Sequence, residues 1–511
     1  MEIMDTTLRD GEQTTGVSFN KAEKLAISQY LLGEMNVDRI EVASARVSEG
    51  EFEAVKAITE WAEENDILDR VEVLGFVDGD ISLKWIKDAG GNVINLLTKG
   101  SLKHVKNQLR KTPEEHVKDI KNVIDRAEDM GMEVNIYLED WSNGIISSPD
   151  YVFFIMDELK DTNIRRFMLP DTLGILNPAQ TREFISRMVE KYPEVHFDFH
   201  AHNDYDLAVA NVFAAVRNGV KGVHTTVNGL GERTGNAPLA SVLGILNDHL
   251  KIENKLKESK LTKLSKLVET ISGVRIPANK PLIGEYVFTQ CSGVHADGDN
   301  KDNLYYNDLL PERFGRIRKY ALGKTSGKAN ILKNLQELGI TLTAEEMKKV
   351  TQRVIELGDK KESVTTEDLP YIISDVLRST SIDNKIKVKN YYLSLAHGLR
   401  PVATLSLQID KKTYQESSVG DGQYDAFMKA LWKIYEKLEK QRPLLIDYSV
   451  TIPPGGKTNA LVEAIITWDL NGKEFKTRGL DADQTEAAIK ATVKMLNIIE
   501  NFNNNYTNEI L

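Results

Sequence analysis

Short apolar runs alternate with amphipathic helical patterns through the first half of the chain. Each run has the length of a buried strand, and the segment after it repeats apolar residues at helical spacing. Such β–α units in a stretch of about 250 residues are typical of a closed (β/α)8 TIM barrel, with a doubly wound open sheet as the alternative. The predicted strands are Glu2–Leu8, Arg39–Ala43, Val71–Phe76, Val93–Leu97, Glu133–Leu138, Arg166–Leu169, Val195–His200 and Gly222–Val227.

Several predicted helices begin at recognisable start signals. Thr112, Ser148 and Asn177 each stand directly before a proline, which favours the first helical position. Asn20 with Glu23 has the pattern of a capping box. These signals support the alternation of strands and helices that the apolar pattern predicts.

The rhythm changes twice after the barrel, so we expect three parts: a barrel over 1–255, a mostly helical linker region over 256–383 and a C-terminal α+β domain over 384–511. The linker region is expected to contribute residues to the active site. The last part reads as two copies of one sheet-plus-helix unit, and Asn471-Gly472 is a hairpin signal inside the second copy. Its predicted strands are Tyr391–Ala396, Val402–Ile409, Ile446–Ile452 and Ala460–Leu470, with helices over Tyr424–Leu438 and Asp483–Ile499.

Composition narrows the function classes. The formal net charge of −11 argues against general binding to nucleic acids or anionic membranes, which requires clustered Lys and Arg. The single cysteine, Cys291, excludes a disulfide within the chain and a multi-cysteine zinc site, and it is interpreted as structural rather than nucleophilic. No signal peptide and no apolar segment of membrane-spanning length is visible, so a cytoplasmic location is expected.

Three polar clusters fall where a barrel places its active site, at and after strand ends. They are residues 5–13 after the first strand, 200–204 at the end of the seventh and 228–236 after the eighth. Because the first and last strands of a closed barrel are neighbours, we expect the three clusters to converge. The glycines of the third cluster are interpreted as a tight loop that delivers Asn236, since they open no recognisable dinucleotide-binding unit.

The second cluster has the residue types of a metal site. His200 and His202 are one residue apart and therefore face the same side of an extended strand. With Asp10 as a carboxylate and Asn236 as an amide oxygen, they form a set suited to Zn, Mn, Co or Fe, although an isolated H-x-H pair is more often packing or surface. Arg9 beside such a metal can stabilise an oxyanion. The alternative is a purely structural role, in an ion pair with Glu12 or Glu232.

Long motifs carry a resemblance to a known family. The chain resembles the DRE-type TIM-barrel metallolyases, which condense or cleave by Claisen and aldol chemistry, and within them the isopropylmalate synthase branch. The motifs lie at Thr7–Gln13, His200–Asp204, Gly231–Asn236, Gly293–Gly298, Leu322–Lys328 and Ile452–Thr458. Further segments narrow the likeness to the pyruvate-using members of that branch: Ile40–Ser48, Asn95–Ser101, Tyr137–Gly144, Pro170–Gly174 and Pro311–Arg316.

The resemblance implies an acyltransferase that converts acetyl groups to alkyl on transfer, with acetyl-CoA as co-substrate and a divalent metal (Zn, Mn or Co). It assigns the metal to Asp10, His200, His202 and Asn236. It further assigns the keto oxygen of the 2-oxoacid to Arg9, the substrate carboxylate to Thr172, deprotonation of the acetyl methyl to Glu139 with His295, thioester hydrolysis to Tyr305 and further substrate contact to Gln13. His295 and Tyr305 lie outside the barrel sequence, so they are expected to come from the partner subunit of a homodimer.

Leu74, Leu97 and Tyr137 stand at the ends of the third, fourth and fifth predicted strands. If they line the 2-oxoacid pocket, they leave room for the methyl of pyruvate and exclude the branched group of 2-oxoisovalerate, the alternative substrate. The alternative role for these residues is structural, as side chains that fill the barrel interior.

The C-terminal repeats resemble the regulatory domain of the branch. This predicts inhibition by isoleucine, with leucine as the alternative, at a site for which the candidates are Asp421, Tyr424, Asp425, Pro454 and Thr458. The glycine-rich stretches around them can equally be turns that the repeat requires. The shared barrel motifs also allow a lyase that runs the reverse reaction, and a non-enzymatic metal sensor is a further alternative.

Overall fold

The computed structural model describes residues 1–299, 301, 303–337, 340–359, 364, 366–369, 372–373, 376, 385–409, 412–451 and 462–505. The chain divides into two compact units, which are considered separately. The first holds Met1–Thr289 with Tyr306–Arg318, and the second holds Gln290–Tyr305 with Lys319–Leu511. Among the described residues, no helix is long and apolar enough to cross a membrane.

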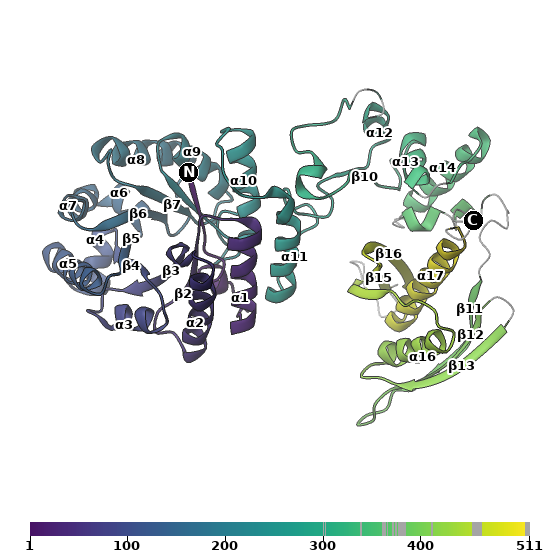
Figure 1. Cartoon of the computed structure of the whole chain (residues 1–511). Coiled ribbons are helices and arrows are strands. Elements are labelled where there is room, and N and C mark those ends of the chain that lie inside the picture. Colours follow the sequence, from purple (N-terminus) through teal and green to yellow (C-terminus); the bar gives the residue numbers. More distant parts are fainter. Residues whose placement is uncertain are drawn as a thin grey trace. The chain divides into compact units, whose positions relative to one another are not determined.

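The first unit contains a closed parallel barrel, so the predicted TIM barrel is confirmed and the open sheet is excluded (Figure 1). Each strand pairs with the next, and the first pairs in parallel with the last through Glu2–Gly222 to Asp5–Thr225. The strands are β1 (Glu2–Asp5), β2 (Arg39–Ser44), β3 (Val71–Phe76), β4 (Val93–Lys99), β5 (Glu133–Glu139), β6 (Ile164–Asp171), β7 (Phe197–Ala201) and β8 (Gly222–Thr225).

Helices surround the barrel and cover its outer face (Figure 1). They are α1 (Lys21–Gln29), α2 (Glu49–Glu64), α3 (Ile81–Asp88), α4 (Leu102–His104), α5 (Pro113–Asp129), α6 (Trp141–Ser147), α7 (Pro149–Leu159), α8 (Pro178–Lys191), α9 (Ala208–Arg217), α10 (Leu239–Asp248) and α11 (Leu261–Ser272). Their apolar faces pack with the outward-facing strand residues into one large core.

The predicted start signals are present in the structure. Asn20, Thr112 and Asn177 each cap a helix through a complete capping box. Ser148 precedes α7 with a proline at the first position, but its side chain makes no cap hydrogen bond. Its hydroxyl instead donates to the carbonyl of Gly144 and accepts from the backbone N–H of Leu102.

Strand β1 is shorter than predicted. The predicted run continued to Leu8, whereas pairing stops at Asp5 because the chain then turns: the N–H of Thr7 donates to the carboxylate of Asp5, and the N–H of Asp10 donates to the carbonyl of Thr6. This turn places Asp10 at the mouth of the barrel, by which we mean the end at which the strands terminate.

The second unit contains the repeated architecture that the sequence predicts. Its first copy has strands β11 (Ile386–Leu393), β12 (Val402–Ile409) and β13 (Lys412–Val419) with helix α16 (Gln423–Lys437). Its second copy has strands β14 (Leu444–Thr451), β15 (Val462–Leu470) and β16 (Lys473–Asp481) with helix α17 (Gln484–Asn505). Apolar residues of both copies form one shared core.

Each copy has three strands rather than the two that the sequence analysis predicts. Strand β13 carries no fully buried residue, so its sequence lacks the apolar alternation of a half-buried strand. Strand β16 is the return arm of the hairpin at Asn471-Gly472 and pairs with β15 throughout its length. The run predicted over Tyr391–Ala396 begins earlier, at Ile386.

The region between barrel and repeats contains α12 (Gly293–Asp299), α13 (Lys328–Glu337) and α14 (Ala344–Asp359), with the short strands β9 (Thr289–Gln290) and β10 (Lys319–Tyr320). Helices α13 and α14 contribute to a separate small apolar core with residues of 364–373. A part of the region predicted as linker therefore has a core of its own.

Candidate metal centre and substrate pocket

Asp10, His200 and His202 come together at the mouth of the barrel. Nε2 of His200 lies 3.0 Å and Nε2 of His202 lies 3.7 Å from Oδ2 of Asp10. All three side chains are buried, and one possible ligand atom from each lies within 4.8 Å of the others. No other group of three or more His, Cys, Asp or Glu side chains of this kind occurs among the described residues. The predicted convergence of the first two clusters is therefore present in the structure.

The third cluster delivers Asn236 as predicted. Asn236 forms an isolated β-bridge with His202, and its Nδ2 donates to the carbonyl of Leu230 at 3.2 Å. The loop is tight: a Cβ on Gly231 would lie 2.4 Å from Nδ2 of Asn236, and one on Gly235 would lie 1.9 Å from the carbonyl oxygen of Gly229. Both glycines also have positive φ, so the loop requires them.

Partnerless polar atoms mark this cluster as a ligand site. Oδ1 of Asp10, Nδ1 of His202 and Oδ1 of Asn236 are all buried and have no hydrogen-bond partner in the part of the chain that the structure describes. Buried polar atoms are normally paired, so a cluster of unpaired ones needs an explanation. Two imidazoles, a carboxylate and an amide oxygen fit a divalent cation.

The electrostatics of the cluster agree with this fit. Burial alone would raise the pKa of Asp10, but the positive charge of Arg9 and the hydrogen bond with His200 outweigh it and lower that pKa far below its usual value. Burial lowers the pKa of His200 and lowers that of His202 to about 4. An ionised carboxylate next to neutral imidazoles is the protonation state that a metal requires of its ligands.

Arg9 lies beside the cluster and forms no ion pair with Glu12 or Glu232, the purely structural alternative. Its Nη1 is 3.5 Å from Oδ2 of Asp10, its Nε donates to Oε2 of Glu41 at 2.6 Å, and its Nη2 donates to the hydroxyl of Tyr137 at 3.3 Å. Glu12 is instead held by the buried Lys24. The guanidinium is therefore fixed at the mouth of the barrel.

The predicted pocket residues form a group of their own. Leu74 and Tyr137 belong to a small apolar cluster with Met4 and Met168, and Leu97 packs against it. This cluster is separate from the large core outside the barrel. The residues come from strands β1, β3, β4, β5 and β6, so they face the barrel interior. Tyr137 links this apolar group to Arg9.

Glu139 ends strand β5 and forms an ion pair with Lys99, which ends β4. The resemblance does not assign Lys99, although its position at a strand end is a signal that could have identified it. Glu139 is partly exposed, which leaves it accessible to a substrate.

Thr172 follows β6 and is partly buried. Its hydroxyl oxygen accepts the backbone N–H of Asp140 at 2.9 Å, and its carbonyl accepts from Nη2 of Arg233 at 2.8 Å. Since the hydroxyl oxygen accepts that bond, its hydrogen is available to another acceptor. Gln13, the remaining barrel candidate, is exposed in the short helix η1 (Gly11–Gln13).

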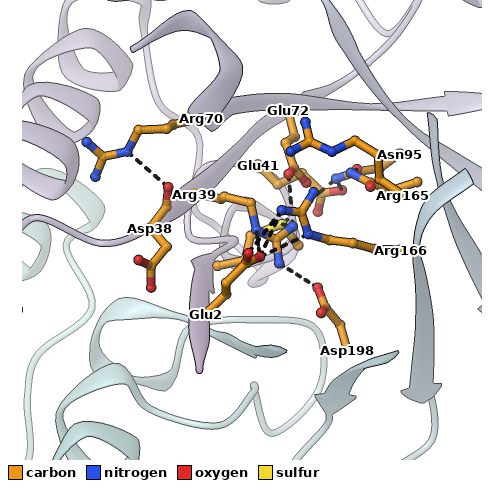
Figure 2. Close-up of polar contacts among 12 residues, drawn as sticks. Glu2, Asp38, Arg39, Glu41, Arg70, Glu72, Asn95, Arg165, Arg166 and Asp198 are labelled. Carbon is orange, nitrogen blue, oxygen red and sulfur yellow. Dashed lines mark hydrogen bonds and ion pairs between the residues drawn. The ribbon is translucent and has the colours of Figure 1, made fainter. Parts of the chain in front are cut away.

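A network of buried charges lies at the floor of the barrel, by which we mean the end at which the strands begin. Figure 2 shows Arg39 among the carboxylates of this network. Arg39 is 3% exposed and contacts Glu2 at 3.1 Å, Glu72 at 2.8 Å and Asp198 at 2.5 Å. Arg166 also pairs with Glu2, at 2.9 Å. The apolar pattern of the sequence does not predict this network, although the charged residues inside the apolar strand runs are a signal for it.

His295 and Tyr305 lie in the second unit and are packed together. Their ring centroids are 4.2 Å apart, and Nδ1 of His295 is 3.1 Å from Oε1 of Gln290. Gly298 allows this packing, because a Cβ there would lie 2.4 Å from the ring of Tyr305. Tyr305 is 41% exposed. The structure thus joins these two candidates to each other. Cys291, nearby in sequence, is free and exposed.

The regulatory candidates are described in part. Asp421 is exposed and pairs with Arg400, and Asp425 accepts the backbone N–H of Asp421 at 2.8 Å. Tyr424 joins the two repeats: its ring lies 5.3 Å from that of Tyr448, and its hydroxyl is 2.7 Å from Oγ1 of Thr492. The other two candidates, in the loop before β15, lie outside the described residues: Pro454 and Thr458.

Comparison with known families accounts for most of the chain. Residues 1–268 match the HMGL-like family, residues 282–362 match the homocitrate synthase post-HMGL domain-like family, and residues 363–500 match the LeuA allosteric (dimerisation) domain. Together, the fold and the candidate metal centre define a TIM-barrel enzyme of a metal-dependent family.

Full-length relatives narrow the class. The chain is 32% identical to an (R)-citramalate synthase of Methanocaldococcus jannaschii, over 98% of this chain and 100% of that protein. It is 33% identical to a 2-isopropylmalate synthase of the same organism, over 97% and 94%, and 33% identical to one of Oceanobacillus iheyensis, over 97% and 96%. The chain belongs to the HMGL-like family, in the branch that holds the citramalate and 2-isopropylmalate synthases.

Proposed function

We propose that the protein is an (R)-citramalate synthase, which condenses acetyl-CoA with pyruvate and hydrolyses the resulting thioester to citramalate and CoA. The observation that carries the choice of pyruvate is the apolar cluster of Leu74, Leu97 and Tyr137 with Met4 and Met168 in the barrel interior. Tyr137 places this cluster next to Arg9, and its bulky side chains would limit the space for a substituent larger than a methyl group. Citramalate made in this way is the first intermediate of a threonine-independent route to isoleucine.

Asp10, His200, His202 and Asn236 would hold the divalent cation. Possible ligand atoms of the first three lie within 4.8 Å of one another, and Asn236, which pairs with His202 in a β-bridge, has a buried Oδ1 without a partner. A bound cation supplies Lewis-acid polarisation of the keto group and a template for the 2-oxoacid. Zn, Mn and Co all suit this set of ligands.

The chain's own residues supply the remaining chemistry. Arg9 is fixed by Glu41 and Tyr137 so that its free N–H groups can stabilise negative charge that develops on the keto oxygen. Thr172 can donate its hydroxyl hydrogen to the substrate carboxylate, since the oxygen already accepts from Asp140. Gln13 is exposed and lies close to Arg9 in the sequence, and it is proposed as a further substrate contact.

Glu139 is proposed as the base for the acetyl methyl group, working as a pair with His295. Lys99 holds the carboxylate of Glu139 at the strand end. A thioester methyl is a very weak acid, so its proton must be removed next to a waiting electrophile. Tyr305, whose ring packs against that of His295, would assist the later hydrolysis. We propose that His295 and Tyr305 come from the partner subunit of a homodimer.

A 2-isopropylmalate synthase that uses 2-oxoisovalerate in leucine biosynthesis is the second candidate. The relatives support it as well as the first candidate, because citramalate and 2-isopropylmalate synthases match the chain at nearly equal identity. The two candidates share every residue named above except those of the pocket wall.

The deciding experiment measures thiol release from acetyl-CoA by purified full-length protein with a divalent metal, in parallel with pyruvate and with 2-oxoisovalerate. We expect release with pyruvate, abolished by a chelator, and a kcat/KM for pyruvate higher than for 2-oxoisovalerate by about 10- to 200-fold or more, given the limited discrimination per methylene. Release with 2-oxoisovalerate alone would assign the protein to the second candidate. Silence with every 2-oxoacid would leave the lyase reaction.

Neighbouring leucines on β4 provide a matched pair for the pocket. Leu97→Val shortens a side chain in the barrel interior and so enlarges the space for the substrate. Leu96→Val removes the same atoms from the core outside the barrel. We expect Leu97→Val to raise the relative kcat/KM for 2-oxobutyrate, which is one methylene larger than pyruvate, by about 10-fold. Leu96→Val should leave this ratio unchanged. Equal ratios in the two variants would remove Leu97 from the pocket.

We also propose that isoleucine inhibits the enzyme by binding in the repeated domain near Asp421, Tyr424 and Asp425. Tyr424 supports this location because it contacts both repeats. Gly420 supports the alternative, that the glycine-rich stretch is a turn required by the repeat. A Cβ at this position would lie 2.2 Å from the backbone nitrogen of Ala426, so the turn itself requires glycine. An activity titration with isoleucine and with leucine separates the two; no response to either would refute regulation by these amino acids.

A further inference from the structure

His224 is a fully buried histidine on β8 that no motif assigns to the site. Its Nδ1 lies 3.3 Å from Nδ1 of His200 and 3.1 Å from the hydroxyl of Tyr137. Its Nε2 lies 3.1 Å from Oδ2 of Asp198. One imidazole therefore touches a candidate metal ligand, the wall of the proposed substrate pocket and a carboxylate of the barrel floor.

The contact with Asp198 determines which nitrogen of His224 carries the hydrogen. Asp198 is also bound by Nη2 of Arg39 at 2.5 Å and faces Nε2 of His196 at 3.0 Å, so it is an ionised acceptor. Nε2 of His224 must then carry a hydrogen and donate to Asp198. A neutral imidazole that is protonated on Nε2 presents a lone pair at Nδ1.

The other end of the contact matches this lone pair. Nε2 of His200 points toward Asp10, on the side where the ligand atoms converge. When His200 ligates through Nε2, its single hydrogen lies on Nδ1 and faces Nδ1 of His224. Histidine ligands characteristically donate their second N–H to a partner that orients the ring and raises its basicity.

We propose that His224 is a positioning residue for the metal centre: it accepts the Nδ1–H of His200 and is itself oriented by Asp198, which Arg39 holds. The chain Arg39–Asp198–His224–His200 thus links the charged floor of the barrel to the metal ligands. The hydroxyl of Tyr137 lies 3.1 Å from the same nitrogen and can donate to Glu41, so His224 also contacts one wall of the proposed substrate pocket. The inference rests on the proposed metal centre.

The test measures metal affinity in full-length protein by titration with Co²⁺, followed through its visible d–d absorption. His224→Leu removes the acceptor and should weaken cobalt binding by about 10- to 100-fold, as is typical when the partner of a metal-ligating histidine is lost. His224→Gln retains an oxygen toward His200 and an N–H toward Asp198, so it should recover most of the affinity.

His116→Leu is the matched control. His116 is also buried (1% exposed), but its contact is with the hydroxyl of Tyr151 at 2.9 Å and not with a metal-site residue. It reports the general effect of losing a buried histidine and should bind cobalt as the unsubstituted protein does.

The outcomes separate this inference from the proposed function. If the unsubstituted protein binds no cobalt, the metal centre itself is wrong. If it binds cobalt and His224→Leu binds equally well, only the role of His224 is overturned. If His224→Leu does not fold, neutron diffraction from metal-bound crystals decides: deuterium on Nε2 and none on Nδ1 of His224 is expected, and deuterium on Nδ1 would overturn the proposal.

Discussion

The two ends of the barrel both bury charges, but they use them differently. At the floor, Arg39 lies among Glu2, Glu72 and Asp198, so each carboxylate has a cationic partner. One oxygen of Glu72 lacks a hydrogen-bond partner there, but it does not converge with ligand atoms of other residues. At the mouth, Asp10, His202 and Asn236 each have a buried polar atom without a partner, and possible ligand atoms of Asp10, His200 and His202 lie within 4.8 Å of one another.

The difference distinguishes a structural network from a binding site. Buried charges that pair with one another contribute to a specific arrangement of the strands. Removing one partner leaves the other charges uncompensated in a medium of low dielectric. Buried polar atoms that converge without partners cost stability until a ligand binds them. The variants below therefore should separate loss of activity from loss of stability.

The largest effect is expected at the mouth. Asp10→Asn removes the anionic ligand and should lower kcat/KM in the thiol-release assay by about 10³-fold, the equivalent of about 4 kcal/mol of transition-state stabilisation. Its thermal unfolding without metal should fall by less than that of Arg39→Met, because Arg9 loses the charge of Asp10 but keeps its ion pair with Glu41. Near-normal activity would show that Asp10 is not a ligand.

Next in size is the reciprocal change at the floor. Arg39→Met leaves Glu72 and Asp198 buried without their cation, and such uncompensated charges typically cost about 3–5 kcal/mol. We expect the barrel transition in calorimetry to fall by roughly 10 °C. Lys21→Met is the control, since its ion pair with Glu53 is about half exposed and contributes about 0.5 kcal/mol or less. Equal shifts in both variants would contradict the comparison.

A smaller stabilisation should follow from filling the mouth. A divalent cation at 100 times its Kd should add about 2.7 kcal/mol to the folded state and raise the barrel transition by roughly 5–10 °C. The same addition should do nothing for Asp10→Asn, while Arg39→Met should still respond. A cation that stabilises all three proteins alike would be binding elsewhere.

The smallest effect is expected at the rim of the floor. Arg166 pairs with Glu2, which is 34% exposed, so water can replace much of the lost interaction in Arg166→Met. We expect a loss of about 1 kcal/mol, well below that of Arg39→Met. Calorimetry under the same conditions compares the two arginines, and a loss as large as that for Arg39 would show that burial is not what sets the cost.

The sequence predicted the barrel because its strands are apolar runs flanked by capped helices, and local signals of this kind do not depend on distant contacts. It also predicted the convergence of Asp10 with His200 and His202, since strand ends meet in a closed barrel. It missed β13, whose residues alternate between exposed and partly buried positions but lack the apolar residues that mark a half-buried strand. The floor network was missed because ion pairing between strands depends on register and on side-chain direction.

Other properties depend on contacts that one sequence does not specify. The pairing of Glu139 with Lys99 requires β4 and β5 to be in register, which only the folded barrel shows. The link from Asp198 through His224 to His200 requires three side chains from two neighbouring strands to come within hydrogen-bond distance of one another. His224 looks like an ordinary strand residue in the sequence, and only its contacts distinguish it.

The pairing of β1 with β8 has a consequence for the order of events during folding. Asp10 comes from the first strand's loop, whereas His200, His202 and Asn236 belong to the last two strands and their loops. A nascent chain that has synthesised only the early strands holds one ligand and cannot retain a cation. The metal centre therefore arises when the ring of strands closes, and uptake of metal during refolding would time that closure.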